Sequence, residues 1–175
     1  MNFNNKTPLS FTVTSCLILV LLGLNVAALE TDKSSPIFIE ANQVAMSEGT
    51  GVSTYSGNVK LEQGSIKILA ESIVIYTNNK KLRRIIATGK PAYFSQQPKP
   101  KAEPVKASAN HVEYDSTSGI LVLLDDAKMT QGSNLFSGNK IEYDTNNNIL
   151  TAKSLSKNKQ RVKAVIQANT FREAD

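Results

Sequence analysis

The sequence is poor in the residues that build covalent or metal-centred sites. Its 175 residues include one cysteine, one histidine and no tryptophan. A single cysteine excludes a disulfide framework or a cysteine-based zinc site within one chain. A single histidine excludes any site that needs a histidine pair. No cofactor and no metal are therefore expected.

Motifs of catalysis and nucleotide binding are also missing. The chain contains no G-x-S-x-G, no H-E-x-x-H and no glycine-rich phosphate loop. His111 has an outward register, typical of a solvated imidazole at a strand end. The pair Asp125-Asp126 fits an acidic turn at a strand end better than a calcium site, because further oxygen donors at loop spacing are absent. We expect a protein that is not an enzyme.

The charge balance is modest. The formal net charge is +5, and 20% of residues are charged. Basic residues gather at 80–84, 99–101 and 157–163, where solvation explains them and attraction to the phosphates of an anionic amphiphile is the alternative. Aromatic residues for stacking on bases are not interleaved with them, so no nucleic-acid partner is expected.

The first 28 residues predict a secretory signal peptide. Lys6 is the only charge before an apolar run at 16–24, and small residues precede a cleavage point after Ala28. A transmembrane anchor needs about 20 apolar residues, and Asn25 interrupts the run too early. A lipid-attached cysteine would follow the run, whereas the only cysteine opens it. We expect a soluble, exported chain over residues 29–175 that folds as a single domain.

Short apolar–polar alternations and an internal repeat organise the exported chain. Alternation with a period of two is typical of strands with one buried face. The segment NHVEYD at 110–115 recurs 29 residues later as NKIEYD at 139–144. Turns at 78–79, 116–119 and 146–148 contain the residues that tight hairpins favour. The pattern predicts an all-β fold of repeated strand–turn–strand units.

A proline- and lysine-rich segment at 98–104 separates the two halves of this pattern. Three prolines in seven residues favour an extended, solvated loop over a central strand. A long surface hairpin within one domain is the preferred interpretation, because neither half alone buries much apolar surface. A hinge between two domains is the alternative.

The alternation assigns one apolar set to the interior face. Its members are Ile37, Ile39, Tyr55, Val59, Leu61, Ile66, Ile68, Ile73, Ile75, Phe94, Val112, Tyr114, Leu121, Leu123, Met129, Phe136, Ile141 and Tyr143. Polar neighbours such as Lys60 and Glu113 face outward. An ordinary packed sandwich core explains this set, and so does a groove that accepts hydrocarbon chains. Alternation alone does not choose between the two.

Six segments form an ordered series along the chain. They are PIFIEA (36–41), YSGNV (55–59), QGSIKI (63–68), GKPAYF (89–94), GNKIEY (138–143) and KQRV (159–162). Together with the leader, this series resembles the OstA-like family of periplasmic lipopolysaccharide-transport proteins. The resemblance spans about residues 36–167.

The resemblance implies a fold and a function. The fold would be an open, twisted antiparallel β-jellyroll with an apolar interior that is open at both ends. The function would be to carry the acyl chains of lipopolysaccharide, with the interior set as lipid-binding residues and Ile37, Ile39, Phe94 and Tyr114 at lipid-contacting positions of the family. Proteins of this kind stack head to tail and bridge the inner and outer membranes, so the localisation would be the periplasm.

The resemblance also implies partners. They would be further copies of the chain, an LptC-like inner-membrane jellyroll and an LptD-like outer-membrane jellyroll. Exposed edges around 36–40 and 161–167 would pair with these neighbours. The implied self-association residues are Ile37, Phe38, Ile39, Arg161, Val162, Ala164 and Ile166. The chain departs from the family mainly in its 98–104 loop, its asparagine-rich turns and the lack of a long polar tail.

Two alternatives stay open at the level of the sequence. The chain is the jellyroll domain of an LptC-like, membrane-anchored partner if its N-terminal apolar run is retained as an anchor. It is a non-catalytic secreted β-sandwich that binds another glycolipid or a polysaccharide if exposed aromatic platforms accompany the strands. A hydrolytic relative would need a close pair of carboxylates, and the sequence shows none.

Overall fold

The structure is a computed structural model that describes residues 32–79, 81–97, 103–154 and 161–167. The predicted signal peptide lies outside these ranges. Within them, helix is confined to one 3-10 turn, η1 (Asp32–Ser34). No helix in the described part of the chain has the length and hydropathy needed to span a membrane.

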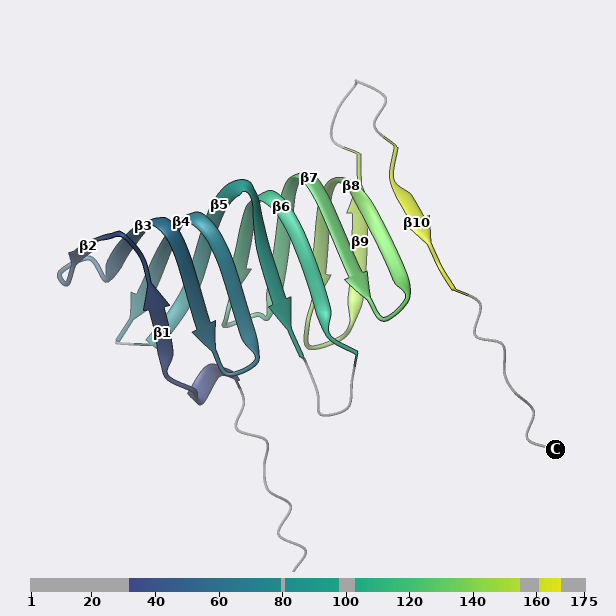
Figure 1. Cartoon of the computed structure of the whole chain (residues 1–175). Coiled ribbons are helices and arrows are strands. Elements are labelled where there is room, and N and C mark those ends of the chain that lie inside the picture. Colours follow the sequence, from purple (N-terminus) through teal and green to yellow (C-terminus); the bar gives the residue numbers. More distant parts are fainter. Residues whose placement is uncertain (1–31, 80, 98–102, 155–160, 168–175) are drawn as a thin grey trace, which may run out of the picture.

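Antiparallel strands form one continuous 10-stranded sheet (Figure 1). The strands are β1 (Ile37–Glu40), β2 (Gln43–Ser47), β3 (Val52–Gln63), β4 (Ile66–Asn78), β5 (Lys81–Gln96), β6 (Val105–Asp115), β7 (Ile120–Gln131), β8 (Asn134–Asp144), β9 (Ile149–Lys153) and β10 (Lys163–Val165). Strands β3 to β8 pair in chain order. The prediction of an open, twisted antiparallel β-jellyroll is confirmed.

The predicted repeat is a structural repeat. The Asp115 carboxylate accepts backbone hydrogen bonds from Thr117 and Ser118, both at 2.9 Å, in the turn between β6 and β7. The Asp144 carboxylate accepts the equivalent bonds from the turn at 145–148, between β8 and β9. Each aspartate satisfies N–H groups that the turn leaves without backbone partners, which is why the same residue recurs at both places.

The segment at 98–104 joins two neighbouring strands. Gln96, at the end of β5, pairs with Val105, at the start of β6. The two strands pair along their length, so this segment connects neighbours within one sheet, as the surface-hairpin interpretation expects. Residues 98–102 themselves lie outside the described residues.

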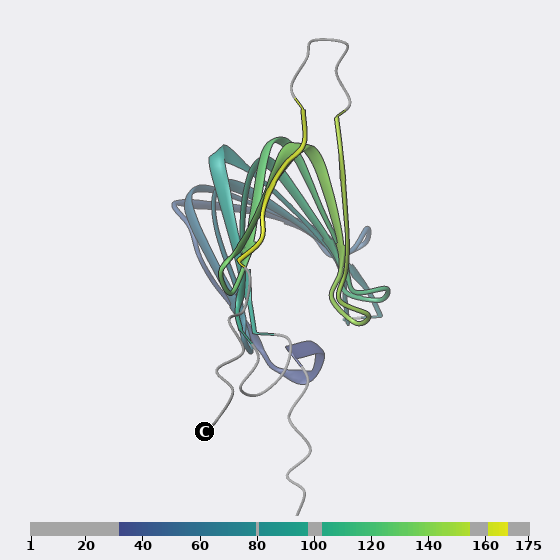
Figure 2. The same ribbon diagram turned by 90° about the vertical axis from the view of Figure 1, so that its right-hand side faces the viewer.

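A line of register shifts crosses the sheet at one level. The shifts fall at Ser56/Val59 between β3 and β4, and then at Leu69/Ser72, Thr88/Ala92, Ser108/His111 and Leu124/Ala127 between successive pairs. Such bulges bend a strand and increase its local twist. The bend gives the sheet an arched cross-section that is open along one side (Figure 2). We call this line the crease.

The crease corrects two expectations. Asp125 and Asp126 lie inside β7 and not at a strand end, with φ of 62° and 56°. Aspartate tolerates this left-handed backbone better than most residues, so the pair builds a bulge. His111 also lies inside β6, beside the crease, although its register is outward as predicted. Glycine fills the same role in β3, since a β-carbon on Gly57 (φ 80°) would collide with Asn42.

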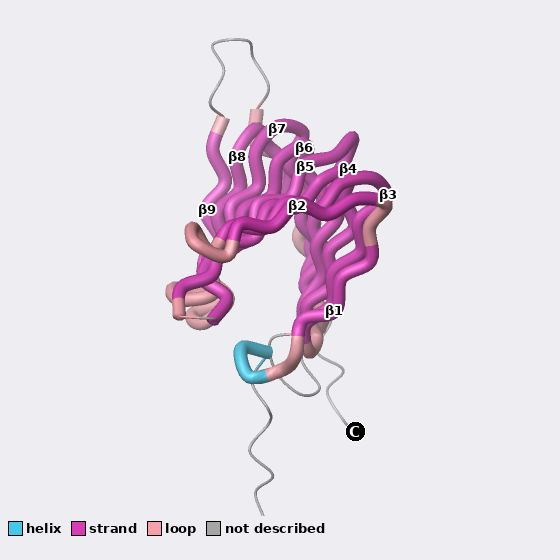
Figure 3. Tube along the Cα trace, turned by 90° about the vertical axis from the view of Figure 1, so that its left-hand side faces the viewer, coloured by secondary structure: helices cyan, strands magenta, loops and turns pink. Residues whose placement is uncertain are grey.

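The crease divides the sheet into two walls. The first wall contains β1, β10 and the arms of β3 to β8 at 59–70, 92–109 and 127–138. The second wall contains β2, β9 and the remaining arms of the same strands. End-on views show the walls facing each other, with β10 on one and β9 on the other (Figure 2) and β1 and β2 at the opposite end (Figure 3). We call the space between them the trough.

Candidate functional site

The middle of the trough is filled by apolar side chains. Leu61, Ile68 and Ile73 are completely buried. The walls also touch across the trough, because the rings of Phe94 on the first wall and Tyr114 on the second have centroids 5.7 Å apart. Every member of the predicted interior set is buried or packs against the buried core. The predicted facing is therefore correct, and the central interior is packed.

The trough is open at the end formed by β1 to β4. A cavity of about 760 Å³ lies there and is lined by Ile37, Ile39, Tyr55 and Ile75, which belong to the predicted lipid-binding set. Met46 and the turn residues at 47–51 complete its rim. Ile37, Ile39 and Tyr55 are half-buried at this opening, whereas Ile75 is 4% exposed. We call this opening the mouth.

The opposite end of the trough is also less densely covered. Phe136, Leu150 and Ala152 are partly buried against the core. The apolar lining thus continues from the mouth to the last strands. Burial is complete in the middle and falls off toward both ends.

The first and last strands carry uncovered edges. β1 and β2 pair in tandem with β3, and β9 and β10 pair in tandem with β8. Among the described strands, none pairs with the outer edge of β1 or β10. An uncovered edge offers a row of backbone N–H and C=O groups to another strand.

The predicted self-association residues lie at these edges. Ile37, Phe38 and Ile39 are on β1, Ala164 is on β10, and Arg161, Val162 and Ile166 flank β10. Phe38 and Ile166 are 66% and 70% exposed. Strands β2 and β9 lengthen the two edges. The strand β9 follows the predicted turn at 146–148, as the repeat of strand–turn–strand units implies, whereas the five-residue strand β2 was not predicted.

Polar side chains line the long open side of the trough, at the tips of both walls. Gln96 and Gln131 end first-wall arms, while Tyr114 and Tyr143 belong to the second wall. Gln131 Nε2 donates to the Tyr143 hydroxyl at 3.4 Å, and the Gln96 side chain lies near that of Tyr114. We call these four residues the polar seam. Sequence reasoning placed the tyrosines in the interior but missed the glutamines, since polar residues were assigned to the outside.

The polar seam is a partly desolvated environment. Burial raises the pKa of Tyr114, and the nearby Asp32 carboxylate raises it further. Burial also raises the pKa of Tyr143. Both hydroxyls are therefore neutral at physiological pH and act as hydrogen-bonding groups. The η1 turn lies under the open side near the mouth (Figure 3), where Asp32 accepts hydrogen bonds from the Ser65 hydroxyl and Gln96 Nε2, both at 2.8 Å.

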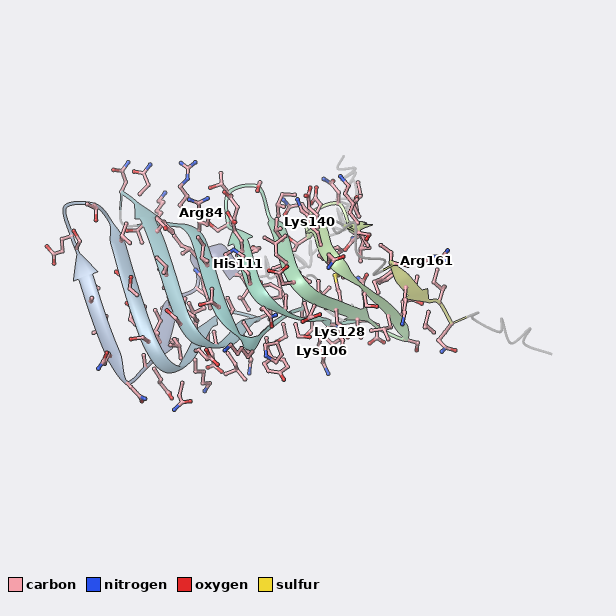
Figure 4. All side chains as sticks on the ribbon, turned by 90° about the horizontal axis from the view of Figure 1, so that it is seen from above. Arg84, Lys106, His111, Lys128, Lys140 and Arg161 are labelled. Atoms are coloured by element: carbon pink, nitrogen blue, oxygen red, sulfur yellow. The ribbon has the colours of Figure 1, made fainter. Side chains whose placement is uncertain are left out.

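Charged residues are on the outer faces of the walls. Seen from above, Lys106 and Lys128 lie on one side of the crease, and Arg84 and Lys140 lie on the other (Figure 4). Arg84 binds Glu113 at 3.0 Å and stacks over the Tyr76 ring, so this member of the 80–84 basic cluster is held by protein partners.

The outer face of the first wall has a hollow of its own, of about 480 Å³. Its exposed apolar residues are Leu69 and Tyr93, and Lys60, Lys67 and Lys106 surround them. Glu62 forms ion pairs with Lys60 and Lys67. Alternation had assigned polar side chains to this face, and the hollow shows that the face is mixed.

No group of three side chains suited to a metal ion occurs in the described ranges. What the structure does contain is a bent β-sheet with a continuous apolar interior, an open mouth and uncovered strand edges. This architecture defines an open β-jellyroll with an apolar interior and uncovered edges on its first and last strands.

Sequence comparisons give the family. Residues 38–149 match the family described as LptA/(LptD N-terminal domain) LPS transport protein, and the chain belongs to this family. The family description is that of a transport protein, which agrees with the expectation that the chain is not an enzyme. The predicted resemblance is confirmed.

Individual relatives point the same way. The chain is 35% identical over 154 residues to the lipopolysaccharide export system protein LptH of Pseudomonas aeruginosa, covering 87% of this chain and 85% of LptH. It is 30% identical over 141 residues to LptA of Escherichia coli K12, covering 79% and 75%. The crystal structure of P. aeruginosa LptH is described as that of the LptA homologous periplasmic component of the conserved lipopolysaccharide transport device. It superposes with a TM-score of 0.73 at 31% identity, covering 79% of this chain and 99% of the chain in that crystal structure.

Proposed function

We propose that the protein carries lipopolysaccharide through the periplasm with the acyl chains inside the trough and the sugars and phosphates outside. The observation that carries this proposal is the apolar lining that runs from the mouth at β1–β4 to the last strands. Family membership supports the identity of the cargo. The predicted export of the chain, with cleavage near Ala28, supports the compartment.

The hydrophobic effect explains why such a cargo needs a carrier. Each CH₂ group exposed to water costs about 0.8 kcal/mol, so one chain of about 14 carbons costs on the order of 10 kcal/mol. A lipid with several chains therefore does not cross water unaided at a useful rate. A trough that covers the chains removes most of this barrier, and an even apolar lining lets them slide without a deep trap.

Loading requires the walls to separate. The Phe94–Tyr114 contact closes the middle of the empty trough, so acyl chains must replace side-chain contacts with lipid contacts. Both are apolar contacts, so the lining of the walls stays covered while the surface of the chain is removed from water. Ile37, Ile39, Tyr55 and Ile75 form the entrance, because the mouth already has space for a chain.

Uncovered edges provide the means of bridging. Strand addition to β1 or β10 would satisfy the free backbone groups and align the trough of one jellyroll with that of the next. Head-to-tail copies of this chain, an LptC-like inner-membrane jellyroll and an LptD-like outer-membrane jellyroll are the proposed partners. Directional movement must come from a component with an energy source, because the lining itself only provides a path.

Native mass spectrometry of the mature protein tests the proposal. We expect a mass increase of one lipopolysaccharide per chain, and higher oligomers as the protein concentration rises. Lipopolysaccharide whose acyl chains have been removed serves as the matched ligand and should not bind. Equal binding of the deacylated ligand would show that the sugars and not the chains are recognised, and the proposal would then be wrong.

A further inference from the structure

One member of the polar seam has an unsatisfied buried atom. Gln96 is 8% exposed, and its Nε2 donates to the Asp32 carboxylate at 2.8 Å. Its Oε1 is buried and has no hydrogen-bond partner among the described residues. A buried acceptor without a donor is destabilising, and native proteins contain few of them. This acceptor at the end of β5 therefore has the capacity for one further donor.

The polar seam lies at the boundary that an amphiphile must cross. Apolar rows fill the trough above it, and near the mouth the η1 turn lies against it, with Asp32 bonded to Gln96. A lipid with its chains inside and its sugars outside places its linkage groups, the esters and amides that join chain to sugar, at the level of Gln96, Gln131, Tyr114 and Tyr143. These four side chains offer uncharged donors and acceptors, which match the chemistry of esters, amides and hydroxyls.

Local charge favours the uncharged linkage over a phosphate. The Asp32 carboxylate lies beside Gln96 and already accepts hydrogen bonds from the Ser65 backbone and hydroxyl. A phosphate at this position would face a like charge. Lys106, Lys128 and Lys140 lie on the outer faces of the walls (Figure 4).

We propose that the polar seam is a binding subsite for the acyl-linkage region of an acylated amino sugar. Gln96 Oε1 accepts a hydrogen bond from the amide N–H or a hydroxyl of the ligand. When the walls part, Gln131 Nε2 leaves Tyr143 and donates to a linkage carbonyl. The inference rests on the proposed function, since it requires acyl chains in the trough, and it adds that the chains are recognised at their point of attachment.

The test compares two ligands that share one acyl chain. N-palmitoyl glucosamine has amide and hydroxyl donors, whereas methyl palmitate has none. Replacing Gln96→Met in the mature protein keeps the length of the side chain and removes its amide. We expect Gln96→Met to bind N-palmitoyl glucosamine about tenfold more weakly, the effect of one lost hydrogen bond to a buried group. Binding of methyl palmitate should stay within about twofold of the wild type.

Controls make each outcome decisive. Gln43→Met changes an exposed glutamine on β2 and should alter neither affinity. Equal losses for both ligands would show that Gln96 shapes the trough, and no loss for either would show that the linkage does not reach the seam; both results overturn the inference. If the Gln96→Met protein does not fold, Gln131→Met applies the same comparison to the second glutamine. If the wild-type protein binds methyl palmitate and lipopolysaccharide but does not prefer N-palmitoyl glucosamine over methyl palmitate, the subsite alone is refuted. If it binds none of these three ligands, the proposed function is refuted, and the subsite with it.

Discussion

Replacing Ile39→Asp places a carboxylate where the first acyl chain would enter. Ile39 lies on β1, faces the mouth and pairs with the fully buried Leu61. A carboxylate in contact with hydrocarbon takes up a proton and does not stay charged. Protonating a group with an ordinary pKa of about 3.9 at pH 7 costs about 4 kcal/mol. Since Ile39 is only half-buried, water screens part of this cost, and we expect lipopolysaccharide to bind about 10- to 100-fold more weakly.

The loss of affinity should depend on pH in a defined direction. Contact with lipid raises the pKa of the introduced carboxyl above its value in the free protein. Below about pH 4 the group is neutral in both states, so the affinity approaches that of Ile39→Asn. As the pH rises above this value, the free protein ionises first, and lipid binding weakens progressively.

A matched variant separates this effect from a general effect of added charge. Leu69→Asp makes the same kind of change on the outer face, where the side chain is 49% exposed and lies near Lys60 and Lys67. It should leave lipid binding unchanged. Affinities are measured by displacement of a fluorescent lipid, and a photo-crosslinker at position 39 should label lipopolysaccharide while one at position 60 should not. Equal losses for Ile39→Asp and Leu69→Asp, or equal labelling from positions 39 and 60, would refute the assigned facing.

Three further predictions concern stability and assembly. Leu61→Ala should lower the free energy of unfolding by about 2–5 kcal/mol in urea titrations, because it leaves a closed cavity. Ile39→Ala leaves no closed cavity and should lower it by about 1 kcal/mol or less. Similar losses for the two variants would mean that the mouth is as tightly packed as the middle of the trough. Deleting residues 161–175 removes the β10 edge and should reduce self-association in sedimentation over a concentration series, and unchanged sedimentation would contradict this. The Ser118 and Thr117 backbone N–H groups lower the pKa of Asp115 below 3.8, so its contribution to stability is present above that pH and lost below it. Asp115→Asn should therefore flatten the loss of stability in acid, and an unchanged acid profile would argue against the turn contacts.

Strand periodicity predicts the facing of the interior well, because alternation depends only on the two sides of a pleated strand. Residues such as Leu61, Ile68 and Ile141 alternate with charged neighbours, and all are buried. Alanines were missed, since Ala87, Ala92 and others of their size are not distinctive in a hydropathy pattern. They are as deeply buried as the large residues and allow the two walls to come close.

The positions of strand ends were harder to predict. Gly57-Asn58 and Asp125-Asp126 have the composition of turns, yet they lie within long strands at the crease. A residue with a left-handed backbone conformation ends a strand only when the chain then reverses direction. Here the neighbouring strands bulge at the same level, so pairing resumes after each shift. Local sequence contains the backbone preference but not the alignment of five bulges across the sheet, which depends on tertiary pairing.

The glutamines of the polar seam illustrate the same limit for the site. Gln96 and Gln131 have inward register, but a polar residue at the end of a strand is normally assigned to solvent. Their partners come from elsewhere in the fold: the Tyr143 hydroxyl of the opposite wall for Gln131, and the Asp32 carboxylate of η1 for Gln96. The facing of a residue within one strand is thus a local property, whereas its partner across the trough is a property of the fold.

The packed middle of the trough bears on how cargo is released as well as how it is bound. The side chains that stabilise the empty protein, such as Phe94 against Tyr114, are the ones that acyl chains must displace. Net affinity for a chain from water is therefore its transfer free energy less the side-chain contacts that it displaces. A carrier with an empty, rigid groove would displace no such contacts and would also cover its own exposed lining, so it would hold its cargo more tightly and release it more slowly. A trough that closes on itself when vacant protects the chains in transit and still lets the next jellyroll, with the same lining, compete for them on nearly equal terms.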